Sequence, residues 1–184
     1  RLCPDAVFHT DATQAFMKVP VSAKDGADMI TVSAHKIEGP KGCGALWISP
    51  AVLKNKGLAA QILGGGQENG LRSGTENTPG IAGMDAAVAG LVHMGPDMPR
   101  RLMAKKLRLV EAVRSVVPDV IVNGPDPAAG APHIVNLGFP GVRGEVMLHA
   151  LEGDGVYVST GSACSSKKLK VSGVLTAMGI RPQV

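Results

Sequence analysis

The sequence is poor in aromatic residues, in cysteine and in long apolar runs. Aromatic side chains make up 3% of its 184 residues, which leaves little surface for stacking bases, so we expect no direct nucleic-acid binding. The three cysteines are odd in number and widely spaced, which supports neither a disulfide framework nor a metal site. No apolar run approaches the ~20 residues that cross a bilayer, and no targeting segment is recognisable. We therefore expect no membrane association and a cytoplasmic location.

What is present is the composition of a folded globular protein. Hydrophobic residues make up 45% of the chain, enough to bury the core of one or two domains. The formal net charge of +4 is mild. We interpret the basic clusters at 100–108 and 167–168 as solvated helix faces, although a basic surface near Cys164 could also attract an acidic partner.

Short apolar runs punctuated by glycine and proline dominate the first third of the chain. They predict buried strands of a mixed or parallel sheet at 6–10, 29–33 and 44–48. The glycine-rich stretch 64–70 predicts a mobile or turn-forming loop. Helical spacing predicts helices over 78–94 and 98–117. The second helix would place Leu102, Leu109, Val113 and Val116 on one face and its lysines and arginines on the other.

The last third of the chain predicts an α+β layer. It contains strands near 120–122, 133–137 and 156–159, and helices over 144–152 and 171–178. The long helix over 98–117 is a plausible bridge between two domains.

A lysine follows the predicted strand 29–33, with a small hydroxyl and an imidazole just before it. Lys36, preceded by Ser33 and His35, can form a Schiff base with an aldehyde. A lysine of ordinary pKa, about 10.4, is mostly protonated at neutral pH. The site must therefore favour the neutral amine by desolvation or by nearby positive charge.

A pyridoxal phosphate (PLP) site also needs an acid that keeps the pyridine nitrogen protonated. Asp11 directly follows the first predicted strand, at the carboxyl edge where open α/β sheets bind ligands, and Gln14 follows as a hydrogen-bonding group. Each residue alone has an ordinary explanation: a surface lysine, a turn-forming aspartate or a core imidazole at His35. The combination favours a cofactor site.

Several motifs occur in the order seen in cysteine desulfurases. They are 11–14 (DATQ), 33–36 (SAHK) with 39–42 (GPKG), 72–75 (RSGT) and 159–166 (STGSACSS). Over roughly residues 6–180 the chain resembles the iron–sulfur-cluster-assembly branch of this family, in the class V aminotransferase group of PLP enzymes. The resemblance implies an α/β fold: part of a fold type I large domain with a mixed sheet, plus part of a smaller α+β C-terminal domain.

The resemblance also implies roles for individual residues. Lys36 would be the Schiff-base lysine and proton shuttle, Asp11 the partner of the pyridine nitrogen and Gln14 a hydrogen-bond donor to the ring oxygen. Ser33 and His35 would hold the phosphate. Thr75 is similar to a residue that reaches the phosphate of the neighbouring subunit, which implies a homodimer.

Cys164 is the cysteine of the remaining motif. Taken alone, a free cysteine is most often a small buried hydrophobe, but the serines around it argue against an apolar environment, and Lys167 and Lys168 could lower its pKa. The resemblance implies that its thiolate takes sulfur from L-cysteine as a persulfide, releases L-alanine and passes the sulfur to an acceptor such as an iron–sulfur cluster scaffold.

The family's site has parts with no counterpart in this sequence. An upstream glycine–threonine loop, an imidazole that stacks on the ring and an arginine that binds the substrate carboxylate are missing. We therefore expect residues 1–97 to form the latter part of a PLP-binding large domain, and 98–184 a linking helix with an incomplete small domain that carries Cys164. The segment alone should be weak or inactive. A selenocysteine lyase, a class V aminotransferase and a non-catalytic interaction fragment remain alternatives.

Overall fold

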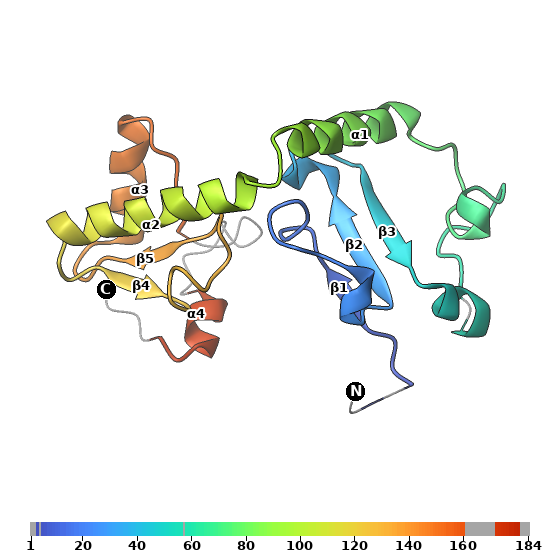
Figure 1. Cartoon of the computed structure of the whole chain (residues 1–184), viewed down its shortest axis with the longest axis horizontal. Helices are drawn as coiled ribbons and strands as arrows, with labels where there is room; N and C mark the ends of the chain where they lie inside the picture. The colour runs from blue at the N-terminus through green and yellow to red at the C-terminus, as the bar shows by residue number, and fades with distance from the viewer. Residues whose placement is uncertain (1–2, 4, 57, 161–171, 181–184) are drawn as a thin grey trace. The chain divides into compact units, whose positions relative to one another are not determined.

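The computed structural model describes residues 3, 5–56, 58–160 and 172–180. The chain divides into two compact units, Arg1–Arg101 and Leu102–Val184, which are described separately (Figure 1). In the part of the chain that the structure describes, no helix is both long and apolar enough to cross a bilayer.

The first unit is built on a three-stranded sheet in the order β1-β2-β3. Its strands are β1 (His9–Asp11), β2 (Met29–Ser33) and β3 (Gly44–Ile48). β1 pairs with β2 in parallel and β2 pairs with β3 in antiparallel. The expected mixed sheet is thus confirmed, and β2 and β3 have their predicted bounds. β1 begins later than predicted, because its register with β2 starts only at His9, opposite Met29.

The two faces of this sheet differ in polarity because successive side chains of a strand point to opposite sides. On one face, Ile30 and Val32 are buried with Ala12 and Ala27, and partly buried apolar side chains such as Phe16 and Met84 pack against them. An apolar cleft of about 240 Å³ opens on this face, and Trp47, which is 41% exposed, lines it. The opposite face carries the polar side chains His9, Asp11, Thr31 and Ser33 beside the apolar Met29, Leu46 and Ile48.

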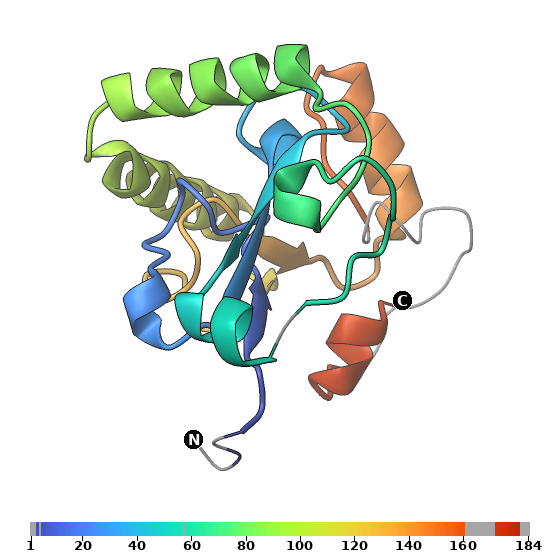
Figure 2. The ribbon, with the colours of Figure 1, turned by 90° about the vertical axis from the view of Figure 1, so that its right-hand side faces the viewer.

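Helix α1 (Thr78–His93) crosses above the end of the sheet at which β2 ends and β3 begins (Figures 1 and 2). Its N-terminus forms where it was predicted, because the Asn77 side chain caps it by accepting a hydrogen bond from Gly80 N–H at 3.1 Å. The strands are joined through η1 (Ala23–Asp25) and η2 (Ala34–Lys36), and the π-helical η3 (Val52–Lys56) and η4 (Glu68–Gly70) lie between β3 and α1.

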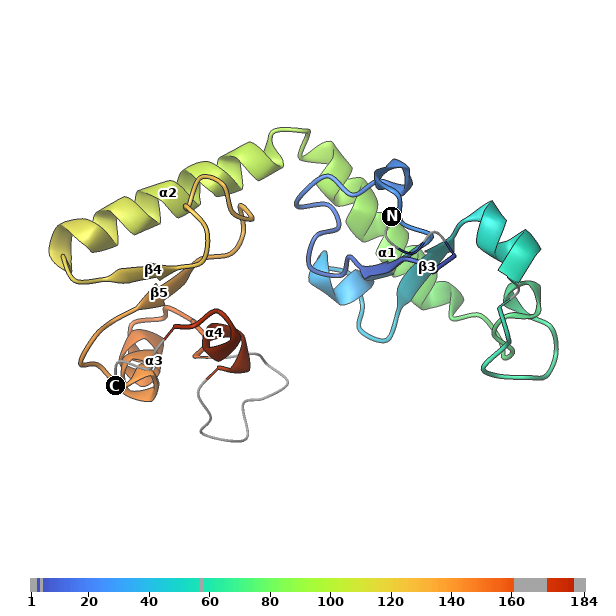
Figure 3. The same ribbon diagram turned by 90° about the horizontal axis from the view of Figure 1, so that it is seen from below.

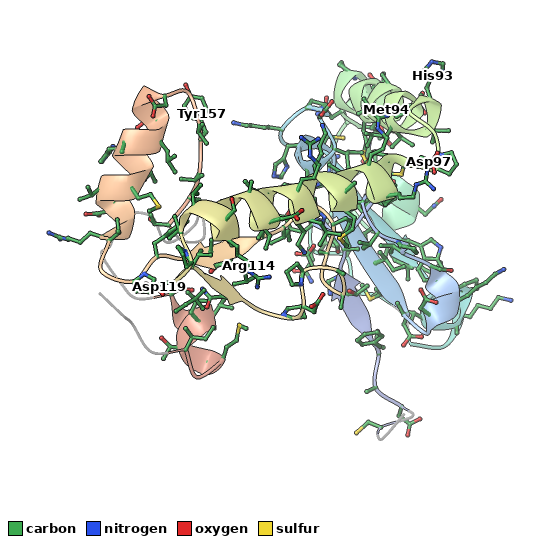
Figure 4. All side chains as sticks on the ribbon, turned by 60° about the vertical axis from the view of Figure 1, so that its left-hand side comes forward. His93, Met94, Asp97, Arg114, Asp119 and Tyr157 are labelled. Atoms are coloured by element: carbon green, nitrogen blue, oxygen red, sulfur yellow. The ribbon has the colours of Figure 1, made fainter. Side chains whose placement is uncertain are left out.

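The second unit consists of most of helix α2 and a smaller sheet. Its elements are α2 (Met98–Val116), β4 (Ile121–Asn123), β5 (Asn136–Gly138), α3 (Gly144–Gly153) and α4 (Gly173–Ala177). β4 and β5 are antiparallel. Figure 3 shows α2 and α3 on opposite sides of this strand pair. Figure 4 shows Tyr157, which is 81% exposed, on the segment that follows α3.

Two predictions for the second unit are wrong. The lysines of α2 were expected on the face opposite the apolar residues, but Lys106 is buried with Val110, whereas Leu109 and Val116 of the predicted apolar face are exposed. Lys106 can lie inside because its aliphatic stem packs there while Nζ donates to Ala131 O at 3.0 Å. Residues 156–159 form no strand: apolar residues alone do not make a strand without a paired neighbour, and none is found among the described residues.

Candidate cofactor site

The ends of β1 and β2 bring the first candidate residues together. Because the two strands are parallel neighbours, their carboxyl ends lie at the same edge of the sheet, with Asp11 opposite Thr31. Ser33 ends β2, and η2 carries His35 and Lys36 immediately beyond it. Two segments that are well apart in sequence therefore present a carboxylate and an amine at one edge, which is where open α/β sheets bind ligands.

Asp11 is held as a carboxylate by the turn that follows it. Thr13 N–H donates to Asp11 Oδ1 at 2.9 Å, the geometry of an Asx turn. Hydrogen bonds from the Thr13 hydroxyl and the Thr13 N–H lower the pKa of Asp11 below its ordinary value; desolvation opposes them, and the charge of His9 lowers it further. A carboxylate is the group that a protonated pyridine nitrogen requires.

Two hydroxyl contacts join β1 to β2 beside Asp11. The Thr13 and Ser33 hydroxyl oxygens lie 3.4 Å apart, a long contact that leaves the Ser33 hydroxyl available to a ligand. His9 Nε2 lies 2.7 Å from Thr31 Oγ1. His9 and Asp11 share one face of β1, because side chains two apart on a strand point the same way. These contacts fix the polar face of the sheet.

Lys36 is presented by a tight turn. Ala34 O accepts hydrogen bonds from the N–H groups of Ile37 and Gly39, both at 2.9 Å. Ala34 is fully buried and Ile37 is 1% exposed, so the turn is anchored on both sides of Lys36. The Lys36 side chain is half-buried. Among the described residues, no hydrogen bond or ion pair holds its amine.

A second lysine lies near the first. Lys18 is half-buried in the turn after β1, and its pKa is lowered by burial and then by the charge of Lys36. The turn after β1 therefore places a second cationic side chain near Lys36.

The other predicted residues lie in different settings. Gln14 and His35 are exposed near the strand ends, and Thr75 is exposed in the segment that enters α1. The loop around η4, between β3 and α1, leads to that segment. Asp11, Ser33 and the Lys36 turn share one sheet edge, whereas Thr75 belongs to the segment before α1. Cys164 lies outside the described residues.

Three contributors to the site were not assigned a role from the sequence. Thr13 stands two residues after Asp11, the spacing of an Asx turn, and His9 stands two before it, on the same strand face; both spacings are recognisable signals. Lys18 has no such signal, because only the packing of the turn brings it near Lys36.

The donor set fits PLP. It combines an amine for the aldehyde (Lys36), a carboxylate for the pyridine nitrogen (Asp11), and hydroxyl and imidazole groups for the phosphate (Ser33 and His35). Among the described residues, no cluster of histidine, cysteine and acidic side chains could hold a metal ion.

The sequence matches a known protein family and is similar to known enzymes. Residues 3–181 match the family described as aminotransferase class-V. The chain is 42% identical over 175 residues to a cysteine desulfurase IscS of Clostridium botulinum (strain Hall) and 45% identical over 176 residues to a cysteine desulfurase of Sinorhizobium fredii. These alignments cover 94% and 95% of this chain but 43% and 44% of those proteins. The chain thus spans less than half the length of these curated relatives.

A solved structure agrees with the sequence relatives. A NifS-like protein superimposes with a TM-score of 0.81 at 32% identity, covering 98% of this chain and 45% of the other. The resemblance to cysteine desulfurases and the α/β fold class predicted from the sequence are both confirmed.

Proposed function

Because the chain belongs to the aminotransferase class-V family, we propose that it is part of a PLP-dependent cysteine desulfurase. The observation that carries this proposal is the meeting of Asp11 and the Lys36 turn at one sheet edge. We assign Lys36 to the cofactor aldehyde, Asp11 to the pyridine nitrogen and Gln14 to the ring oxygen. Ser33 and His35 take the phosphate.

In the proposed reaction, PLP supplies the sink for the electron pair left when the substrate loses its Cα proton. With PLP bound, the Lys36 amine would be the base placed to take that proton and to return it. Asp11 holds the pyridine nitrogen protonated, which its lowered pKa supports.

Sulfur leaves L-cysteine through Cys164. The thiolate attacks the substrate sulfur, the carbon–sulfur bond breaks and a sulfur–sulfur bond forms, so that one L-cysteine and one thiol give one L-alanine and one persulfide. Because a thiolate is the nucleophile, the basic residues Lys167 and Lys168 next to it in the sequence favour this role. The persulfide sulfur then passes to an acceptor protein, such as a scaffold for iron–sulfur clusters.

The proposal extends to assembly and domains. In the family that the chain resembles, the residue similar to Thr75 reaches the cofactor phosphate of the neighbouring subunit, so we infer a homodimer with composite sites. We infer that residues 1–97 belong to the PLP-binding large domain and 98–184 to a linking helix and small domain. A cytoplasmic location suits an enzyme that supplies sulfur to soluble acceptors.

The experiment uses the full-length protein that carries this chain. With PLP and L-cysteine it should form alanine and a visible absorbance band of lysine-bound cofactor. Lys36→Ala should remove the band and lower alanine formation by at least about 100-fold, whereas Lys24→Ala, at an exposed lysine of η1, should change neither. Cys164→Ser should keep the band but carry no persulfide in mass spectrometry. Retention of the band in Lys36→Ala would refute the assignment.

A further inference from the structure

The residues before Thr75 form a closed loop over 62–75. Its ends meet where Ile62 pairs with Arg72 in a parallel bridge, and Ser73 N–H donates to Ile62 O at 3.1 Å. Ser73 is buried, and its hydroxyl accepts a hydrogen bond from Gly66 N–H at 3.4 Å. Thr75 therefore follows a segment that is anchored within the loop itself.

Arg72 spans the exit of this loop. Its Nη1 donates to Gly74 O at 3.0 Å and to Thr75 O at 3.2 Å. Hydrogen bonds from a charged donor are stronger than neutral ones. Because the two acceptors are successive backbone carbonyls, the guanidinium fixes the peptide groups that follow Gly74 and Thr75. The Thr75 side chain stays exposed.

Gln67 holds the same segment from its N–H side. Gln67 Oε1 accepts a hydrogen bond from Gly74 N–H at 3.0 Å. Gly74 has a φ of 109°, a conformation that residues with a side chain rarely adopt. The Gln67 amide has room because Gly65 lies beside it: a Cβ there would come within 2.9 Å of the amide atoms. Gly74 is thus fixed through both its N–H and its C=O.

We propose that Arg72 and Gln67 are positioning residues that orient Thr75, so that its hydroxyl binds the cofactor phosphate in a second copy of the chain. This rests on the proposed function, which assigns Thr75 to that phosphate. Arg72 is a cation in a motif beside a phosphate ligand, yet its guanidinium is engaged with backbone carbonyls. Arg72 therefore contributes to phosphate binding indirectly, by fixing the backbone that carries the Thr75 side chain.

The test compares PLP with pyridoxal, which lacks the phosphate, by titrating each into the full-length apoprotein. Thr75→Val should weaken PLP about 10-fold, the loss of one hydrogen bond to a charged group, and leave pyridoxal unchanged. Arg72→Met should do the same. Because both act on one contact, the double variant should be no weaker than Thr75→Val alone. Arg114→Gln, at an exposed arginine of α2, is the matched control and should change neither affinity.

The outcomes separate the two claims. If Thr75→Val weakens PLP and Arg72→Met does not, the positioning role is wrong and the phosphate role of Thr75 stands. Equal weakening of PLP and pyridoxal in Arg72→Met means that Arg72 serves the fold alone, which also overturns the proposal. An unchanged PLP affinity in Thr75→Val refutes the phosphate role and the positioning role with it.

A second variant covers the case in which Arg72→Met does not fold. Gly65→Ala leaves Arg72 in place, and its added Cβ displaces the Gln67 amide from Gly74. It should weaken PLP about 3-fold, since a neutral hydrogen bond is worth less than a charged one, without weakening pyridoxal. An unchanged PLP affinity in Gly65→Ala would count against the proposal.

Discussion

The two units bury a lysine in different ways. Lys106, in the second unit, lies on the buried face of α2 and is 9% exposed, and its Nζ donates a hydrogen bond to Ala131 O. Lys36, in the first unit, is half-buried at a strand end, and no hydrogen bond or ion pair holds its amine among the described residues. Lys106 is thus structural, because a backbone carbonyl accepts its hydrogen bond. Lys36 is available for chemistry, because it lies beside another lysine at the edge of the sheet where ligands bind.

The turn that presents Lys36 gives the largest expected effect. Ile37→Ala removes the side chain that anchors this turn, which is 1% exposed, and should lower the free energy of unfolding by about 2–5 kcal/mol in urea titrations. The matched control is Ile81→Ala, whose side chain is 49% exposed and which should cost about 1 kcal/mol or less. Equal losses in the two variants would mean that the turn is not anchored as described.

The anchoring of Lys106 is the next test. Lys106→Ala leaves Ala131 O without its donor and removes a packed stem, so the free energy of unfolding should fall by about 1–3 kcal/mol. Lys105→Ala changes the neighbouring, exposed lysine of the same helix and should stay within about 0.5 kcal/mol. If neither substitution changes the free energy of unfolding, the hydrogen bond from Lys106 to Ala131 O does not stabilise the fold. Lys106 and Lys36 would then not differ in the way described.

The smallest effect concerns Asp11, the acid at the same sheet edge as the Lys36 turn. Since the folded-state pKa of Asp11 lies below its ordinary value, Asp11 stabilises the fold above its unfolded pKa, about 3.9, and this contribution is lost as pH falls through the folded pKa. Thr13→Val removes the hydroxyl that lowers this pKa most and should raise it, whereas Thr13→Ser should not. Carboxyl chemical shifts followed against pH by NMR measure this pKa; an unchanged pKa in Thr13→Val would contradict the role given to the Thr13 hydroxyl.

The sequence was sufficient for the parts of the site that depend on local pattern. Apolar runs located β2 and β3, and the positions of Asp11 and Lys36 after two strands indicated a shared edge, which the parallel pairing of β1 and β2 provides. The proximity of Lys18 to Lys36 could not be predicted, because it depends on how the turn after β1 folds.

The sequence was insufficient where side-chain chemistry overrides a pattern. Lys106 was expected in solvent because it is charged, but its long stem and the carbonyl of Ala131 make an inward position favourable. Residues 156–159 have the composition of a strand, yet a strand also needs a paired neighbour, and composition does not supply one.

The positions of Trp47 and Tyr157 have a spectroscopic consequence. They are the one tryptophan and the one tyrosine of the sequence, and they lie in different units. Trp47 borders the apolar cleft of the first unit, while Tyr157 follows α3 in the second. Intrinsic fluorescence therefore carries a separate natural label for each unit, and a shift of indole emission reports on the sheet that bears the candidate site without any engineered probe.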